Sequence, residues 1–359
     1  MPRSKASTKA TTIGHYGHEV LGLLYRYGGL TRYQLQRLTG LSLAAVGRQT
    51  AHLRRAGMVA IARDSAVWKD RAQGAPKGRP YSVYYLTVPT GARAGGRAVG
   101  LEYDRGALRG YRRIQLPATA AHRVAANEYL LTLREAAASA GVEMPYEEVF
   151  SEASPEFPLF GAGRPKTQRR DTSYRYTAIV PDGSFVLGTP SGEQRFYLEL
   201  EAGLRTPQVV AKLRDYTGRW RRKLAPNEGE VRWHDPEARL EPVVLITANT
   251  SHARSLHRSL YERLPQAEGY GEAADALSGD GGDRVDPRKL VLVAGWDEVR
   301  EAPLGRVYRP LRKYPEGSSE EDGWRVGLAD AAAVSATVTP PTTELARKYS
   351  EVEDKEVAS

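Results

Sequence analysis

Three acidic residues in the second half of the chain are the side chains best suited to chemistry. Asp182 follows an apolar stretch that we expect to be a strand, and Glu199 and Glu201 lie within the segment YLELE. Side chains two residues apart on a strand point to the same face, so Glu199 and Glu201 share one. If the two strands are neighbours, the three carboxylates approach one another, and like charges about 4 Å apart repel by roughly 4 kcal/mol at an effective dielectric of 20.

Such a cluster requires compensation, and the sequence leaves three kinds open. A carboxyl group takes up a proton, a basic side chain lies close, or a divalent cation is bound. Mg²⁺ is typically held by one or two carboxylates with phosphate and water oxygens, and it supports phosphodiester hydrolysis. The alternative is that Glu199 and Glu201 form one solvated face of an edge strand, paired with Arg205 and Lys212.

These residues resemble the core of the PD-(D/E)XK nucleases. The resemblance rests on Pro181-Asp182-Gly183, the strand YLELE, a following helix with Lys212, and a helix, strand, strand, strand, helix, strand order. It implies Asp182 and Glu199 as ligands of Mg²⁺, and it places a further acid on the first helix, for which Glu128 is the candidate. The lysine of that family would fall at Glu201, so Lys212 is the candidate replacement. Without a replacement, the fold would be catalytically silent.

Over about residues 15–300 the chain is similar to the replication-relaxation proteins of bacterial plasmids. The matching segments are GLTRYQLQRLTGLSLAAVGRQTAHLRRAGMV, Pro181-Asp182, and YLELEAGLRT with Lys212 and Tyr216 downstream. Proteins of that family pair a winged helix with a nuclease-like domain. The resemblance implies a role in replication, relaxation or transfer of a mobile element, and it does not fix the reaction.

The first hundred residues follow the pattern of a helix-turn-helix. We expect a helix over His18–Tyr27, a second helix capped by Thr31, a turn at Gly40 and a third helix capped by Ser42. Apolar spacing turns one face of the third helix inward. Its opposite face carries the side chains we expect to meet DNA, namely Ala45, Arg48, Gln49, His52 and Arg55.

A basic hairpin is expected next to this third helix. Met58–Ile61 and Tyr81–Val88 read as strands, and the loop between them supplies Lys69, Arg71, Lys77 and Arg79. Residues 61–115 contain 11 Lys or Arg against 4 Asp or Glu. A helix in the major groove reads base edges through Arg and Gln, whereas wing cations contact phosphates. The alternative is a winged helix used for protein contacts.

The rest of the chain alternates helices and strands, which indicates an α/β fold with a mixed sheet flanked by helices. We expect helices over residues 120–140, 206–221 and 251–264, and strands over 142–150, 174–180, 195–201, 242–248 and 289–294. The expected domains are a winged helix-turn-helix over 13–90, a basic linker over 91–117, a nuclease-like α/β domain over 118–300 and a disordered tail over 330–359.

Composition narrows the classes of partner and cofactor. The 359 residues carry 52 Lys or Arg and 43 Asp or Glu, a net charge of +9, which favours a polyanionic partner such as double-stranded DNA. With no cysteine, disulfides and Cys-ligated zinc are excluded. No apolar run is long enough for a transmembrane helix and the basic start is not a secretory signal, so we expect a cytoplasmic protein. The sequence contains no phosphate-binding loop, so we expect no nucleotide cofactor.

Two hypotheses follow from the sequence. The first is a sequence-specific DNA-binding protein of a plasmid or mobile element whose second domain cleaves DNA with Mg²⁺. The second is a non-enzymatic regulator or replication initiator, whose inactive nuclease fold mediates contacts with a partner or a second copy in a homodimer. The Asp182 and Glu199 pair favours the first, and Glu201 at the lysine position favours the second.

Overall fold

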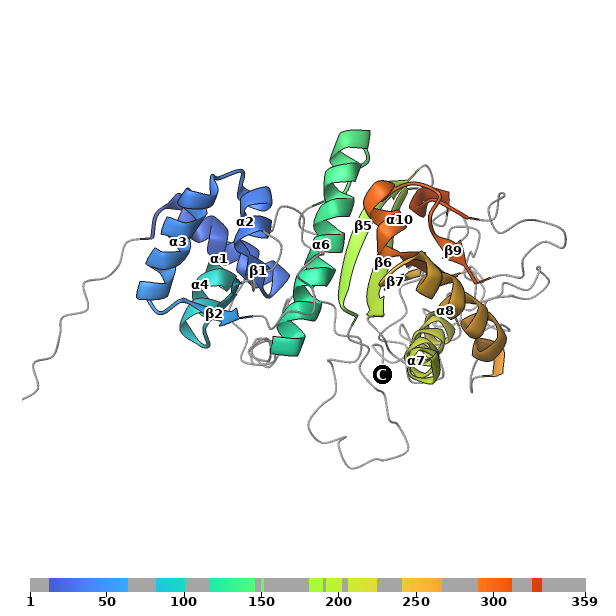
Figure 1. Cartoon of the computed structure of the whole chain (residues 1–359). Coiled ribbons are helices and arrows are strands. Elements are labelled where there is room, and N and C mark those ends of the chain that lie inside the picture. Colours follow the sequence, from blue (N-terminus) through green and yellow to red (C-terminus); the bar gives the residue numbers. More distant parts are fainter. Residues whose placement is uncertain are drawn as a thin grey trace, which may run out of the picture. The chain divides into compact units, whose positions relative to one another are not determined.

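The computed structural model describes ten segments of the chain, and the statements below concern these segments. They are residues 13–63, 82–100, 117–145, 150–151, 181–189, 192–201, 206–224, 241–266, 290–311 and 325–330. They form two compact units (Figure 1). The division falls inside the long helix α6 (Pro117–Ala140), after Leu131. The sequence places it at residue 118, so the first half of α6 belongs with the first unit instead.

The first unit consists of short helices around a small antiparallel sheet. Its sheet has the order β1-β3-β2, so β3, the last of the three strands in the sequence, lies between the other two. The elements are α1 (His15–Tyr27), β1 (Leu30–Thr31), α2 (Arg32–Thr39), α3 (Leu43–Arg55), β2 (Val59–Arg63), β3 (Ser82–Leu86), α4 (Thr90–Ala98) and the two-residue β4 (Phe150–Ser151).

Local capping fixes where α2 begins and ends and where α3 begins. The Thr31 side chain accepts a hydrogen bond from Gln34 N, and Gln34 accepts one from Thr31 N, which makes a capping box. The Ser42 hydroxyl accepts one from Ala45 N. Between these caps Gly40 has a φ of 67°, a left-handed conformation that glycine adopts at little cost. The expected caps and turn are therefore confirmed.

Part of the expected linker is helical. Residues Thr90–Ala98 form α4, whose buried face consists of Gly91, Ala92, Gly95 and Gly96. These small residues let α4 approach α1 closely, since a side chain at Gly95 would meet Leu21 O and Tyr25 Cβ, each at 3.0 Å. The Gly-rich composition that suggested a linker thus marks a tight helix contact.

The second unit is a mixed sheet with helices against it. Strands β5 (Gly183–Thr189) and β6 (Gly192–Glu201) form an antiparallel hairpin, and β7 (Val243–Thr247) and β8 (Val291–Gly295) follow β6 in parallel. The antiparallel β9 (Arg309–Pro310) lies beyond β8. The helices are α7 (Thr206–Leu224), α8 (Thr250–Arg263) and α10 (Trp296–Glu301), and a 3₁₀ turn spans Leu264–Gln266. Helices α7 and α8 lie side by side (Figure 1).

One expected strand differs in part from the structure, and another lies outside the described residues. Residues 142–145, the first part of the expected strand 142–150, have no regular structure, and its last residue, Phe150, belongs to the two-residue strand β4. Glu143 O accepts a hydrogen bond of 2.7 Å from Gly188 N, so this segment meets β5 at its backbone without forming a ladder there. The expected strand 174–180 lies outside the described residues, as do residues 331–359 of the expected tail.

Asp182 directly precedes β5, a strand that the sequence does not predict. The expectation that Asp182 ends the strand 174–180 stays a prediction, since that strand lies outside the described residues. The strand GSFVLGT escapes prediction because its glycines and serine weaken the strand pattern. Among the described residues, no helix is long and apolar enough to cross a membrane.

Candidate functional site

The β5–β6 hairpin fixes Asp182 opposite the end of β6. Asp182 N donates to Leu198 O over 2.9 Å, and Leu200 N donates to Asp182 Oδ2 over 2.8 Å. The two bonds hold the Asp182 carboxylate at the level of Glu199, whose residue number falls between those two partners. The hairpin therefore brings together two acids that are 17 residues apart in the chain.

Helix α7 supplies the other side of the site. Tyr216 OH donates to Glu199 Oε1 over 2.6 Å, and its ring lies 5.9 Å from that of Tyr197, centroid to centroid. Tyr197 and Glu199 alternate with Leu198 along β6, so α7 covers the strand face that carries the acids. Val209 and Leu213 are buried on the same helix, and Lys212 stands beside them.

Three carboxylates converge on the ammonium group of Lys212. Lys212 Nζ forms an ion pair with Glu199 Oε2, and it lies 3.9 Å from Asp182 Oδ2 and 4.0 Å from Glu201 Oε1. The Lys212 side chain is 31% exposed, whereas Glu199 and Glu201 are at most 1% exposed. The compensation that the acidic cluster requires is thus a basic side chain, and Lys212 is the member that reaches solvent.

Burial and charge shift the pKa values of the three central groups. Burial, reinforced by the charge of Asp182, raises the pKa of Glu199 well above 4.5, against the opposing effect of Lys212 and Tyr216. Burial acts to lower the pKa of Lys212, but the carboxylates of Asp182, Glu199 and Glu201 raise it more. Burial and the neighbouring Glu199 raise the pKa of Tyr216. Lys212 is therefore charged, and the burial of Glu199 favours its protonated form.

The carboxylate oxygens of Asp182 and Glu199 are the type of ligand that a hard cation such as Mg²⁺ prefers. Across the described segments, however, no three or more His, Cys, Asp or Glu side chains are arranged to hold a metal ion. Lys212 lies among the oxygens that would be the ligands. Binding of a cation by Asp182 and Glu199 thus requires the ammonium to move aside or share them.

Glu128 lies in the first unit, where α2 engages it. Gln34 Nε2 donates to Glu128 Oε2 over 3.2 Å, and Arg37 forms an ion pair with Glu128 Oε1. The neighbouring Asn127 donates to the backbone oxygens of Tyr27 and Gly29. These contacts explain why the first half of α6 joins the first unit. The role of Glu128 as a further acid of the nuclease-like site stays a prediction.

The outer face of α3 carries part of the expected DNA-contacting set. Arg48 and Arg55 are exposed, while Gln49 and His52 are half-buried. Arg54 is also exposed, although the helical pattern had not singled it out. The apolar spacing of α3 predicts four inward-facing residues, and of these Val46, Thr50 and Leu53 are buried while Leu43 is half-buried. The expected wing residues Lys69, Arg71, Lys77 and Arg79 lie outside the described residues.

Comparison with known families assigns the chain. The family model described as replication-relaxation matches residues 21–231, which is more than half of the 359 residues. The chain belongs to the replication-relaxation family. The matched segment contains both α3 and the cluster around Lys212, and it ends before β7. Comparison with curated proteins and with solved structures finds no match. Family membership points to a role in plasmid replication or relaxation.

Proposed function

We propose that this replication-relaxation protein binds double-stranded DNA sequence-specifically through its first unit, used as a winged helix. The observation that carries the proposal is the outer face of α3, where Arg48 and Arg55 are exposed on a helix capped by Ser42. An α-helix fits the major groove, and Arg reads guanine there with about 1–3 kcal/mol of discrimination per bidentate pair.

The elements around α3 support this use. The order α1-β1-α2-α3-β2-β3, with a tight turn at Gly40 and a three-stranded antiparallel sheet, supports the use of the first unit as a winged helix-turn-helix. Strands β2 and β3 pair over five positions, from Val59 with Leu86 to Arg63 with Ser82. The chain between them carries Lys69, Arg71, Lys77 and Arg79, which we propose as phosphate-binding residues.

DNA binding to fragments of the parent plasmid tests the proposal. Arg48→Ala combined with Arg55→Ala should abolish the preference for one fragment, whereas Lys77→Ala combined with Arg79→Ala should weaken binding to all fragments and lower its salt dependence by about one unit for each phosphate involved. The matched control is Arg97→Ala, which removes an exposed arginine from α4. Unchanged fragment preference in the Arg48 and Arg55 double variant would overturn the assignment of α3.

A second candidate function is cleavage of the bound DNA, favoured by the convergence of Asp182, Glu199 and Glu201 on Lys212. Two acids opposite each other on a hairpin, with a lysine between them, are the groups that the PD-(D/E)XK resemblance requires. The β5–β6 hairpin followed by α7 and a parallel β7 also agrees with the strand order of that fold. Lys212 from α7 would then replace the lysine that is absent at residue 201.

Each group has a chemical role in this candidate. Asp182 and Glu199 would hold Mg²⁺, which supplies charge neutralisation and an activated water when bound. Lys212 would stabilise the negative charge that develops on the attacked phosphate. Tyr216 would orient the Glu199 carboxylate through its hydrogen bond.

Nicking of supercoiled plasmid in Mg²⁺ or Mn²⁺ tests the second candidate. Asp182→Asn, Glu199→Gln and Lys212→Met should each abolish nicking while DNA binding persists. Glu193→Gln, an exposed acid on the same strand, is the matched control and should nick at the normal rate. Absence of metal-dependent nicking by the unmodified protein on any plasmid it binds would favour the non-enzymatic alternative, in which the second unit serves partner or self contacts.

A further inference from the structure

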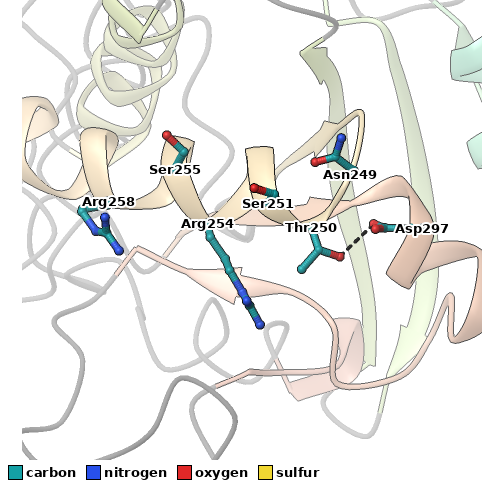
Figure 2. Close-up of a pocket in the computed structure, with 7 residues that line it drawn as sticks. All are labelled: Asn249, Thr250, Ser251, Arg254, Ser255, Arg258 and Asp297. Atoms are coloured by element: carbon teal, nitrogen blue, oxygen red, sulfur yellow. Dashed lines mark hydrogen bonds between the residues drawn. The ribbon is translucent and has the colours of Figure 1, made fainter.

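A polar pocket lies at the beginning of α8. Its volume is about 630 Å³, and its lining includes Thr250, Ser251, Arg254, Ser255, Arg258 and Asp297 (Figure 2). Hydroxyl and guanidinium groups dominate, and none of these side chains is apolar. Such a lining suits a small, strongly hydrated anion and does not suit an apolar ligand.

The pocket occupies the carboxyl edge of the parallel part of the sheet. Glu201 pairs with Thr247, and Thr247 pairs with Gly295, so β6, β7 and β8 end together. Asp297 lies just beyond the end of β8, and α8 begins just beyond the end of β7. In open α/β sheets, ligands bind in the crevice outside the carboxyl ends of the strands. Glu201, within the Lys212 cluster, shares this edge.

Two arginines give the pocket its positive charge. Arg254 and Arg258 are four residues apart on α8, so they project from neighbouring turns of the same helix face (Figure 2). Arg254 is half-buried and Arg258 is exposed, so both guanidinium groups are within reach of a ligand in the open pocket. A guanidinium presents a planar set of donors that matches the oxygens of a phosphate in pairs.

The backbone at the start of α8 is already capped, so the side chains must make the site. The Asn249 side chain accepts from His252 N over 2.9 Å, and Asp297 Oδ1 accepts from the Thr250 hydroxyl over 2.9 Å. Hydrogen bonds from Thr250 and the Glu298 backbone lower the pKa of Asp297 against the opposing effect of its burial. Asp297 is therefore ionised, and its charge is partly satisfied by these donors.

We propose that this pocket binds a phosphate group through Arg254 and Arg258, with the hydroxyls of Ser251 and Ser255 as further donors. The phosphate belongs either to the backbone of bound DNA or to a free nucleotide. The DNA case rests on the proposed function, and there the pocket would hold a backbone phosphate on the same sheet edge as Glu201. The free-nucleotide case needs no DNA binding by α3.

Two binding measurements on the full chain test the pocket. The first titrates a duplex oligonucleotide over a range of salt concentrations, and the second titrates inorganic phosphate and a deoxynucleoside monophosphate by calorimetry. If the ligand is DNA, Arg254→Ala combined with Arg258→Ala should weaken duplex binding about tenfold at low salt and reduce the salt slope by about one unit for each phosphate that the variant no longer binds. If it is a free nucleotide, the double variant should lose binding of the small phosphates and keep that of the duplex.

A matched variant and an added charge make the result specific. Arg263→Ala removes an exposed arginine from the last turn of α8, outside the pocket lining, and should bind both probes normally. Ser255→Glu keeps both arginines but places a carboxylate in the pocket, and it should reproduce the weakened binding.

Several outcomes would overturn the proposal. They are unchanged binding of both probes in the double variant, equally weakened binding in Arg263→Ala, or normal binding in Ser255→Glu. If α3 does not bind DNA at all, the duplex titration fails in the unmodified protein, while the phosphate titration still decides the pocket.

Discussion

Lys212 of α7 forms an ion pair with Glu199 of β6, and the carboxylates of Asp182 and Glu201 surround the same ammonium group. The acid is fully buried, and the lysine is the only member of the cluster with substantial access to solvent among the residues described. A buried acid that depends on one cation is sensitive to loss of that cation, to pH and to competing cations.

Removal of the lysine should destabilise the second unit. In Lys212→Ala, three carboxylates lose their shared cation, and breaking a buried ion pair from one side typically costs about 3–5 kcal/mol. Chemical denaturation should show a lower free energy of unfolding. Arg214→Ala, on an exposed position of the same helix, should change it far less. Equal losses in the two variants would mean that the ion pair is not the cause.

The same variant should acquire stabilisation by divalent cations. Without the ammonium, the carboxylates of Asp182 and Glu199 can both face a metal ion, and binding at 100 times the dissociation constant adds about 2.7 kcal/mol to stability. Thermal unfolding of Lys212→Ala in Mg²⁺ or Mn²⁺ should show a higher midpoint than in a metal-free buffer. Adding Asp182→Asn to the variant should remove the gain, and its persistence there would place the cation elsewhere.

Glu199 should make the protein less stable as pH rises. Its folded pKa lies well above its ordinary value of 4.5, so its contribution is fully present below 4.5 and is lost as pH rises through the folded pKa. Glu199→Gln does not ionise and should escape this loss. Unfolding midpoints measured from pH 4 upward should therefore fall in the unmodified protein relative to the variant. Parallel curves for the two proteins would contradict the raised pKa.

Tyr216→Phe should lose one hydrogen bond to a carboxylate without changing shape. Hydrogen bonds to charged groups contribute about 1.5–3 kcal/mol, so unfolding should require that much less free energy. Tyr16→Phe, at a residue that is 47% exposed, is the control and should be neutral. An unaltered stability in Tyr216→Phe would show that the phenol does not hold Glu199.

Asn127→Ala should weaken the first unit. The amide donates over 3.1 Å to Tyr27 O and over 2.6 Å to Gly29 O, so its removal leaves two buried carbonyls without this donor. An unsatisfied buried group costs about 1–3 kcal/mol. Hydrogen exchange should show faster opening of α1 and β1. Ser139→Ala, on the exposed end of α6, should leave their protection unchanged.

The boundaries of α2 and the start of α3 follow from the sequence. Thr31, Ser42 and Gly40 act on backbone groups within a few residues of themselves, so capping and turn preferences suffice to place α2 and α3. Helices α7 and α8 and strands β6, β7 and β8 are also recognisable, because long periodic or apolar runs report local structure directly. The strand β5 is not, since its glycines and serine hide it until it pairs with β6.

The sequence alone determined which residues are candidates for the site. The tertiary structure decided which of these candidates contact one another. The acids at 182, 199 and 201 stand out because charges in apolar segments need compensation. Whether Lys212 supplies it depends on how α7 lies on β6, which no local spacing encodes. Glu128 shows the same limit, because its partners Gln34 and Arg37 are more than 90 residues away in the chain. Local hydrogen bonds are set by neighbouring residues, whereas long-range charge pairs are set by the packing of whole elements.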